Sequence, residues 1–399
     1  MYIMKTNGLK KITFMILTLV MLLSPVAGYC LPYGDDEAGL NEEIIENKLK
    51  SVDIRSIRDA MDEEIEKMPI AKSYFSSQDI LDGALRGRPA DSLKNLPKIL
   101  LSVLGEEVKA NLALVLQLFA VMVLGAVIRS LQPLGSGIPN EVAKLTVNGV
   151  LIVISAVSFG SIVKTAMTTI ESMQSIASVA MPALFALMAS AGRIVSVSAM
   201  QPLMLFGVNA ACQLLKTVFL PLTVMAGLLF LVDSVSERFK VKNLAKLLKS
   251  GAVWATGILT MVFSVIVSVQ KIASSSVDAV TLKTTRFALG SLVPVAGKYM
   301  ADAADTIILC TTAAGNVAGI LTVTVLIVVS VIPFIKVFVI MLALRLAAAF
   351  GSPICDENVC EAIEEAAGCL SVIMGIMGAA LFVIILLAGT LMNASGVMK

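Results

Sequence analysis

The chain has 399 residues, of which 57% are apolar and 15% charged, with a formal net charge of +2. This composition excludes an ordinary soluble domain, and the small net charge gives no positive field that would attract nucleic acid. Histidine is absent, which removes the commonest general base and the commonest metal ligand. We therefore expect an integral membrane protein that is not an enzyme and that holds neither a cofactor nor a metal.

The amino terminus has the three-part layout of a secretory signal peptide. Basic residues precede an apolar run at 12–23, and small residues follow it at Val26, Ala27 and Gly28. This pattern predicts a signal peptide over residues 1–28, with an uncleaved membrane anchor as the alternative. Either alternative places the segment that follows outside the cytoplasm.

Residues 29–110 carry more acidic than basic side chains and are the most polar part of the chain. Between Leu40 and Met68 the apolar residues recur mostly every three to five positions, which is typical of one face of a helix. The sequence therefore predicts an acidic, extracytoplasmic helical region.

Residues 111–399 read as a polytopic α-helical membrane domain. Four apolar runs are each about long enough to cross a hydrocarbon core of roughly 30 Å: 112–131, 145–163, 251–270 and 370–392. Two further stretches, 176–232 and 317–350, are interrupted by prolines and basic residues. The first could hold three short crossings, or one crossing flanked by re-entrant pieces. We expect about seven to nine spans in an all-α fold.

The distribution of basic residues predicts which segments of the chain face the cytoplasm. Segment 233–250 contains Arg238, Lys240, Lys242, Lys246 and Lys249 against only two acids. Basic connectors stay in the cytoplasm, and the apolar positions here favour a helix lying along the membrane surface. Segment 271–310 then faces the extracytoplasmic side. The acidic residues from Asp356 to Glu365 have no basic neighbours, which favours an external position for them too.

Segment 271–310 carries polar residues at helical intervals in both halves, on either side of Pro294 and Gly297. Proline and glycine at this point predict a hinge between two amphipathic helices. The charged residues that follow the first half are candidates for lining an aqueous path or docking a partner: Arg286, Lys298, Asp302 and Asp305. The alternative is that they form the solvated face of an interfacial helix.

Three motifs give the chain a resemblance to a known family. They read KLTVNGVLIVISAVSF, FLPLTVMAGLLFLVDSVSERFKVKNLAKLLKSG and TTRFALGSLVPVAGKYMADAADT, and they follow the signal peptide and the acidic region. In this order they resemble the stage III sporulation protein AE family of endospore-forming Firmicutes.

The resemblance implies a multi-pass protein of the mother-cell membrane around the forespore. It implies a non-enzymatic part in the stage IIIA assembly, a secretion-like channel complex that sustains late forespore development. The implied partners are other stage IIIA proteins, including ring-forming subunits and an ATPase, together with the lipid bilayer. The residues alone leave an alternative open, a stand-alone secondary transporter of a small solute.

Overall fold

We analysed a computed structural model of the chain, which describes residues 96–131, 138–234, 241–292, 297–353 and 357–393, and Asp59, Asp62, Glu63 and Glu66. The predicted signal peptide and most of the predicted acidic region lie outside these residues, so both remain predictions.

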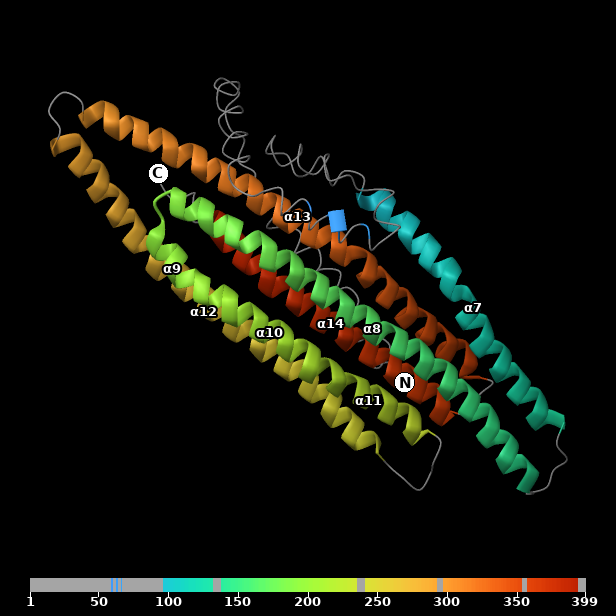
Figure 1. Ribbon diagram of the computed structural model, residues 1–399. Coiled ribbons are helices and arrows are strands. Elements are labelled where there is room, and N and C mark those ends of the chain that lie inside the picture. The colour runs from blue at the N-terminus through green and yellow to red at the C-terminus, as the bar shows by residue number, and fades with distance from the viewer. Residues whose placement is uncertain are drawn as a thin grey trace.

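All the regular elements in the described part of the chain are helical (Figure 1). The long helices are α7 (Leu96–Leu131), α8 (Ile138–Ser190), α12 (Lys242–Leu292), α13 (Gly297–Gly351) and α14 (Glu357–Asn393). Between α8 and α12 lies a helix in five joined pieces, which we call the segmented helix. Its pieces are α9 (Ile194–Pro202), η1 (Leu203–Val208), α10 (Asn209–Leu214), η2 (Leu215–Phe219) and α11 (Leu220–Asp233).

Six helical stretches in the described residues are long and apolar enough to cross a membrane. They are Leu100–Ile128, Leu145–Ser190, Ile194–Asp233, Lys242–Thr285, Thr306–Gly351 and Asn358–Leu391. The structure therefore agrees with an all-α membrane protein. The four apolar runs predicted from the sequence each fall within one helix, or within a residue of its end. The predicted count of seven to nine spans concerns the whole chain and remains a prediction.

The prolines interrupt the helices less than the sequence suggested. Pro182 lies inside α8 and Pro333 inside α13, and both helices continue through them. In the segmented helix the backbone widens into π-helix directly after Pro202 and just before Pro221. The helix continues through both of these π-helical pieces. Stretch 317–350 therefore lies within one long helix, α13, whereas 176–232 contains the last part of α8, a turn at 191–193 and the segmented helix.

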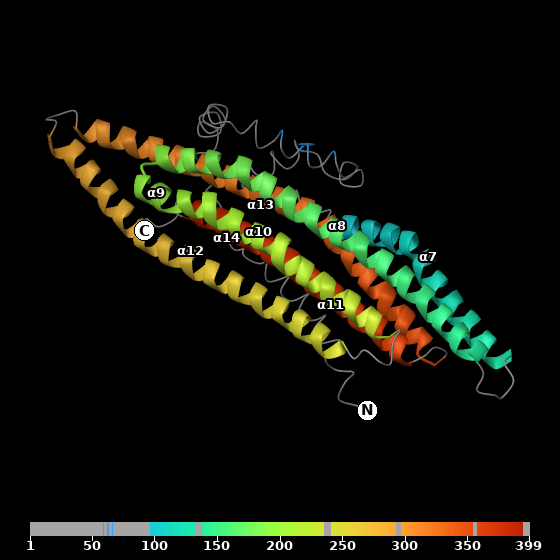
Figure 2. The same cartoon turned by 60° about the horizontal axis from the view of Figure 1, so that its bottom comes forward.

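Helices α13 and α14 form the centre of the bundle. They pack against each other, α7 and α8 pack on one side of the pair, and α11 and α12 cover α14 from the other (Figures 1 and 2). In the apolar stretch that could cross the membrane, 61% of α13 and 56% of α14 is buried, against 17% of α7. The central pair is therefore shielded, while the outer helices present apolar side chains outward.

Consecutive long helices run in opposite directions and define two ends of the bundle (Figure 1). At one end, which we call the basic end, α7, α11 and α13 finish and α8, α12 and α14 begin. The Asp233 carboxylate accepts a hydrogen bond from the Lys242 backbone N–H there, at 2.9 Å. At the other end, the hairpin end, α8 turns into α9 and α12 is followed by α13.

The α8–α9 turn depends on a glycine. Gly192 has a φ of 79°, in the left-handed region that side chains disfavour. A Cβ atom built on Gly192 would lie 2.7 Å from Cδ2 of Leu282, on α12. Both the backbone angle and the close approach of α12 therefore favour glycine at this position.

Two expectations about the basic end need correction. In the described part of 233–250 no separate surface helix is present, because α11 ends at Asp233 and α12 begins at Lys242 and runs without a break to Leu292. The acidic residues of α14 also lie beside the basic connector, since Lys242 Nζ is 2.6 Å from Glu361 Oε2. The expectation that the two lie on opposite sides was wrong, because 317–350 belongs to a single helix and the chain passes along the bundle once there.

Candidate functional site

The four residues proposed from the sequence belong to the tip formed by α12 and α13. Arg286 is in the last turns of α12, and Lys298, Asp302 and Asp305 are in the first turns of α13. In both views this tip projects beyond the α8–α9 turn (Figures 1 and 2). The four side chains lie outside the described atoms, so their role in lining a path or docking a partner remains a prediction.

The predicted hinge residues lie at and just before the start of α13. α12 ends at Leu292 and α13 begins at Gly297, so Pro294 falls between them. The two amphipathic halves of 271–310 are direct continuations of these long helices. Bending at Pro294 and Gly297 remains a prediction.

A row of polar side chains runs along the outside of α8 and continues onto the segmented helix. We call it the polar track. Its members on α8 recur every three or four residues, as one helical face requires. The track consists of Lys164, Thr168, Glu171, Gln174, Ser175 and Ser178 on α8, and Asn209, Gln213, Lys216 and Thr217 on the segmented helix.

Two side-chain contacts hold the two halves of the polar track together. Lys216 Nζ lies 3.2 Å from Glu171 Oε1, and the Gln174 side-chain amide donates a hydrogen bond to Asn209 Oδ1. The Glu171 side chain is 59% exposed and the Lys216 side chain 16% exposed. The ion pair is therefore formed at the surface of the bundle, with the carboxylate facing outward.

The backbone next to these contacts is unusual. Asn209 is the first residue after the π-helix η1, and Lys216 lies within the π-helix η2. π-Helical turns are rare and often occur at functional sites, because they change the direction in which side chains point.

The position of the polar track along the length of the bundle follows from contacts between the segmented helix and α12. A Cβ atom on Gly207 would lie 3.2 Å from the Phe263 ring, and one on Gly251 would lie 3.9 Å from Cδ2 of Leu222. Asn209 and Lys216 are therefore level with residues 251–263 of α12. The outward side chains of α12 at this level are apolar: Val253, Trp254, Ile258, Met261 and Val262.

At this depth the different sides of the bundle therefore differ in polarity. The same level of the molecule carries an apolar surface on α12 and charged groups on α8 and the segmented helix. All three helices are candidate spans. Ionisable groups within spans are rare and usually face a cavity or the bundle interior, so the polar track is the candidate functional site.

The sequence reasoning missed most of this site. Lys216 is one of the basic residues that interrupt 176–232, and the sequence assigned no role to Glu171, Gln174 or Asn209. The signal was the seven-residue spacing of Lys164, Glu171 and Ser178, which places them on one face only when 138–190 is a single helix.

Asp278 forms a second polar centre, nearer the hairpin end. It is 2% exposed, and its two carboxylate oxygens accept hydrogen bonds from the backbone N–H groups of Val195 and Ser196, both at 3.0 Å. These N–H groups belong to the first turn of α9 and have no partner within the helix. Asp278 therefore caps α9 from α12 and fixes the two helices together.

Arg193 stands beside this cap, in the turn before α9. Desolvation by burial lowers the pKa of the Arg193 guanidinium, and the charge of Asp278 opposes that shift. Within the described part of the chain, the buried Nε of Arg193 has no hydrogen-bond partner. The electrostatic attraction to Asp278 helps to keep this half-buried cation in place.

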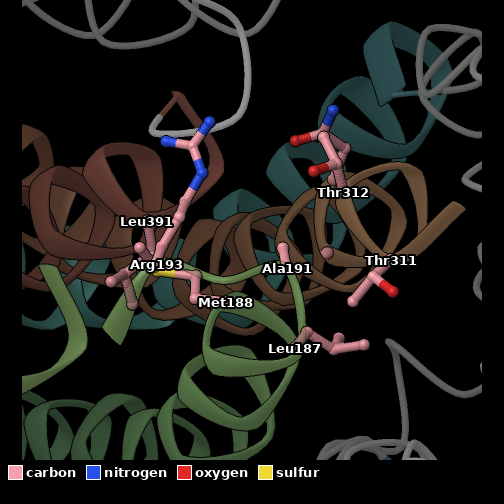
Figure 3. A pocket seen from close by; sticks show the side chains of 9 residues that line it. Leu187, Met188, Ala191, Arg193, Thr311, Thr312 and Leu391 are labelled. Atoms are coloured by element: carbon pink, nitrogen blue, oxygen red, sulfur yellow. The ribbon is translucent and has the colours of Figure 1, made fainter. Parts of the chain in front are cut away.

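A small cavity opens next to Arg193, where the α8–α9 turn meets α13 and the end of α14 (Figure 3). Leu187, Met188, Thr311 and Asn316 line part of it. Its volume of about 20 Å³ is enough for about one water molecule. Pockets that bind small molecules are more than ten times larger, at roughly 300 Å³ or above, so this cavity is too small for a solute site.

Among the residues that the structure describes, no group of three His, Cys, Asp or Glu side chains could hold a metal ion. Charged side chains form ion pairs at Lys216–Glu171, Lys242–Glu361 and Lys249–Glu365.

Comparison with known proteins identifies related sequences. The family model described as stage III sporulation protein AE matches residues 75–395. The stage III sporulation protein AE of Bacillus subtilis (strain 168) is 31% identical over 258 residues, which are 64% of this chain. The aligned region spans 65% of the length of that relative. No solved structure matches the chain. The family match covers most of the sequence and all six candidate spans, so the chain belongs to the stage III sporulation protein AE family.

Proposed function

We propose that this protein is a membrane component of the stage IIIA sporulation complex, a channel or secretion-like apparatus that links mother cell and forespore and is needed for late forespore development. The observation that carries the proposal is the family match over residues 75–395. A bundle of six long apolar helices suits a membrane platform for such a complex.

In this proposal the protein lies in the mother-cell membrane around the forespore and has no catalytic role. Its partners are other stage IIIA proteins, including ring-forming subunits, and an ATPase supplies energy. The basic end faces the mother-cell cytoplasm, because Lys242, Lys246 and Lys249 lie there. The tip of α12 and α13 then faces the space between the two membranes, where ring-forming partners would meet it.

Affinity purification of the full-length chain from sporulating cells tests the proposal. We expect other stage IIIA proteins to be recovered with it, and no such recovery when an unrelated multi-pass protein carries the same tag. Recovery of the chain alone, together with proton-coupled solute uptake by vesicles that contain only this protein, would instead support the stand-alone transporter.

The tip can be tested separately. Changing Asp302→Lys and Asp305→Lys together should impair spore formation or complex assembly while membrane insertion stays normal, because reversed charges repel a partner that fits the natural ones. The matched control is Thr284→Lys with Thr285→Lys, which adds two lysines at exposed positions of the neighbouring arm. Normal sporulation and assembly in the aspartate double variant would remove the role proposed for these residues.

A further inference from the structure

We infer that the polar track faces water at the depth of the bilayer, so that α8 and the segmented helix form one wall of an aqueous groove open to small ions and hydrophilic solutes. The inference rests on the geometry of this chain and is independent of its proposed part in a sporulation complex.

The first step is that lipid does not cover the polar track. At the same depth the exposed side chains of α12 from Val253 to Ile272 are apolar except for Ser268, over about 28 Å along the helix, and Lys271 is half-buried. That length is close to the roughly 30 Å thickness of a hydrocarbon core, so this face of α12 fits lipid. Glu171 and Lys216 lie level with it, and a charged side chain at the centre of a bilayer costs at least about 2.5–3.5 kcal/mol.

The second step is that the ion pair does not remove this cost. Lys216 contacts only one oxygen of Glu171, and 59% of the Glu171 side chain is exposed. Lys164 is exposed on the same face of α8 two turns away and makes no ion pair among the described residues. A partly exposed pair and an unpaired cation both need a polar environment.

The third step favours water over a protein neighbour. The track holds charges of both signs together with hydroxyl groups, and the Thr168 and Ser178 hydroxyls already donate to their own helix backbone. A protein surface covering it would have to supply partners for Lys164 and Glu171 and exclude water from both. Water satisfies the same groups without a matching surface.

The length of the polar track favours a water-filled passage over a single isolated polar site. From Lys164 to Ser178 the polar face is about 21 Å long, which is about two thirds of a hydrocarbon core. The Glu171–Lys216 pair and the Gln174–Asn209 hydrogen bond cross from one helix to the other midway along it. These two contacts hold α8 and the segmented helix together at the point where a passing ion or solute would approach the charged side chains.

Cysteine labelling of the full-length chain in membrane vesicles tests the inference. The variants Ser175→Cys and Ser178→Cys place a thiol on the polar track. The controls Val262→Cys and Val265→Cys place one on the apolar face of α12, where the natural side chains are 50% and 53% exposed. All four are made in a chain whose six native cysteines are replaced and whose melting in detergent matches that of the natural protein.

The reagent is a charged, membrane-impermeant methanethiosulfonate. The cysteine thiolate attacks the sulfenyl sulfur of the reagent, which forms a disulfide and releases methanesulfinate. Because the thiolate forms in water and not in lipid, we expect labelling at 175 and 178 to be at least about ten times faster than at 262 and 265. Equally slow labelling at all four positions would overturn the inference. Nitroxide labels at the same positions then identify the cover, because lipid gives high oxygen accessibility and a protein neighbour gives low accessibility to oxygen and to a water-soluble nickel complex alike.

Discussion

At the scale of single residues, the clearest structural role belongs to Asp278. One buried carboxylate satisfies two N–H groups of α9 and lies near the charge of Arg193, so it connects α12 to residues 193–196, which are more than 80 positions away in the sequence. The sequence showed Asp278 only as one polar position in an amphipathic pattern. Its partners could not be predicted, because they depend on how the α8–α9 turn meets α12 in three dimensions.

We expect Asp278→Ala to lower the free energy of unfolding by about 1–3 kcal/mol, because two buried N–H groups lose their acceptor. Asp278→Asn should cost less, since its amide oxygen can still accept one of these hydrogen bonds. Thermal unfolding of the purified protein in detergent measures both. Ser276→Ala, at an exposed position two residues away, is the control. A melting temperature for Asp278→Ala equal to that of the control would contradict the assigned cap.

At the scale of helices, close packing decides where the chain needs small residues. Gly227 on α11 faces Phe159 on α8, and a Cβ atom at Gly227 would lie 2.6 Å from Cζ of that ring. Phe159 is 1% exposed and is enclosed by the core, so the ring has little room to move. This contact fixes the distance between α8 and α11.

Gly227→Ala should therefore destabilise the protein by about 1–3 kcal/mol, as overpacking of a core does. Adding Phe159→Leu, which shortens the side chain that the new methyl group meets, should restore part of the loss. Gly257→Ala is the control, because a Cβ atom there would have no neighbour within 4 Å. Detergent melting curves compare the four proteins. If Gly227→Ala and Gly257→Ala melt alike, the two helices are not in contact at this point.

Helical spans were predictable from the sequence because apolar runs of sufficient length have few alternatives in a bilayer. The continuity of the helices was not. Pro182 and Pro333 suggested breaks, yet both lie inside long helices, and Pro202 and Pro221 adjoin π-helical turns. The contacts of Glu171 with Lys216 and of Gln174 with Asn209 depend on the register between two helices, which no local pattern in the sequence encodes.

At the scale of the whole molecule, the account rests on the direction in which each helix runs. Six alternating helices bring the beginnings of α8, α12 and α14 to the basic end and leave the tip of α12 and α13 at the opposite end. Two ion pairs, Lys242–Glu361 and Lys249–Glu365, tie α12 to α14 at the basic end. This arrangement contradicts the expectation that the acidic residues in the first turns of α14 lie on the side opposite the basic connector.

Sided cysteine labelling at three positions tests this arrangement most directly. In membranes of known orientation, Lys246→Cys and Ser352→Cys, both at exposed positions near the basic end, should react with an impermeant reagent only from the cytoplasmic side, and Lys298→Cys only from the other. Labelling of 352 from the same side as 298, or of 298 from the same side as 246, would contradict the six-helix arrangement.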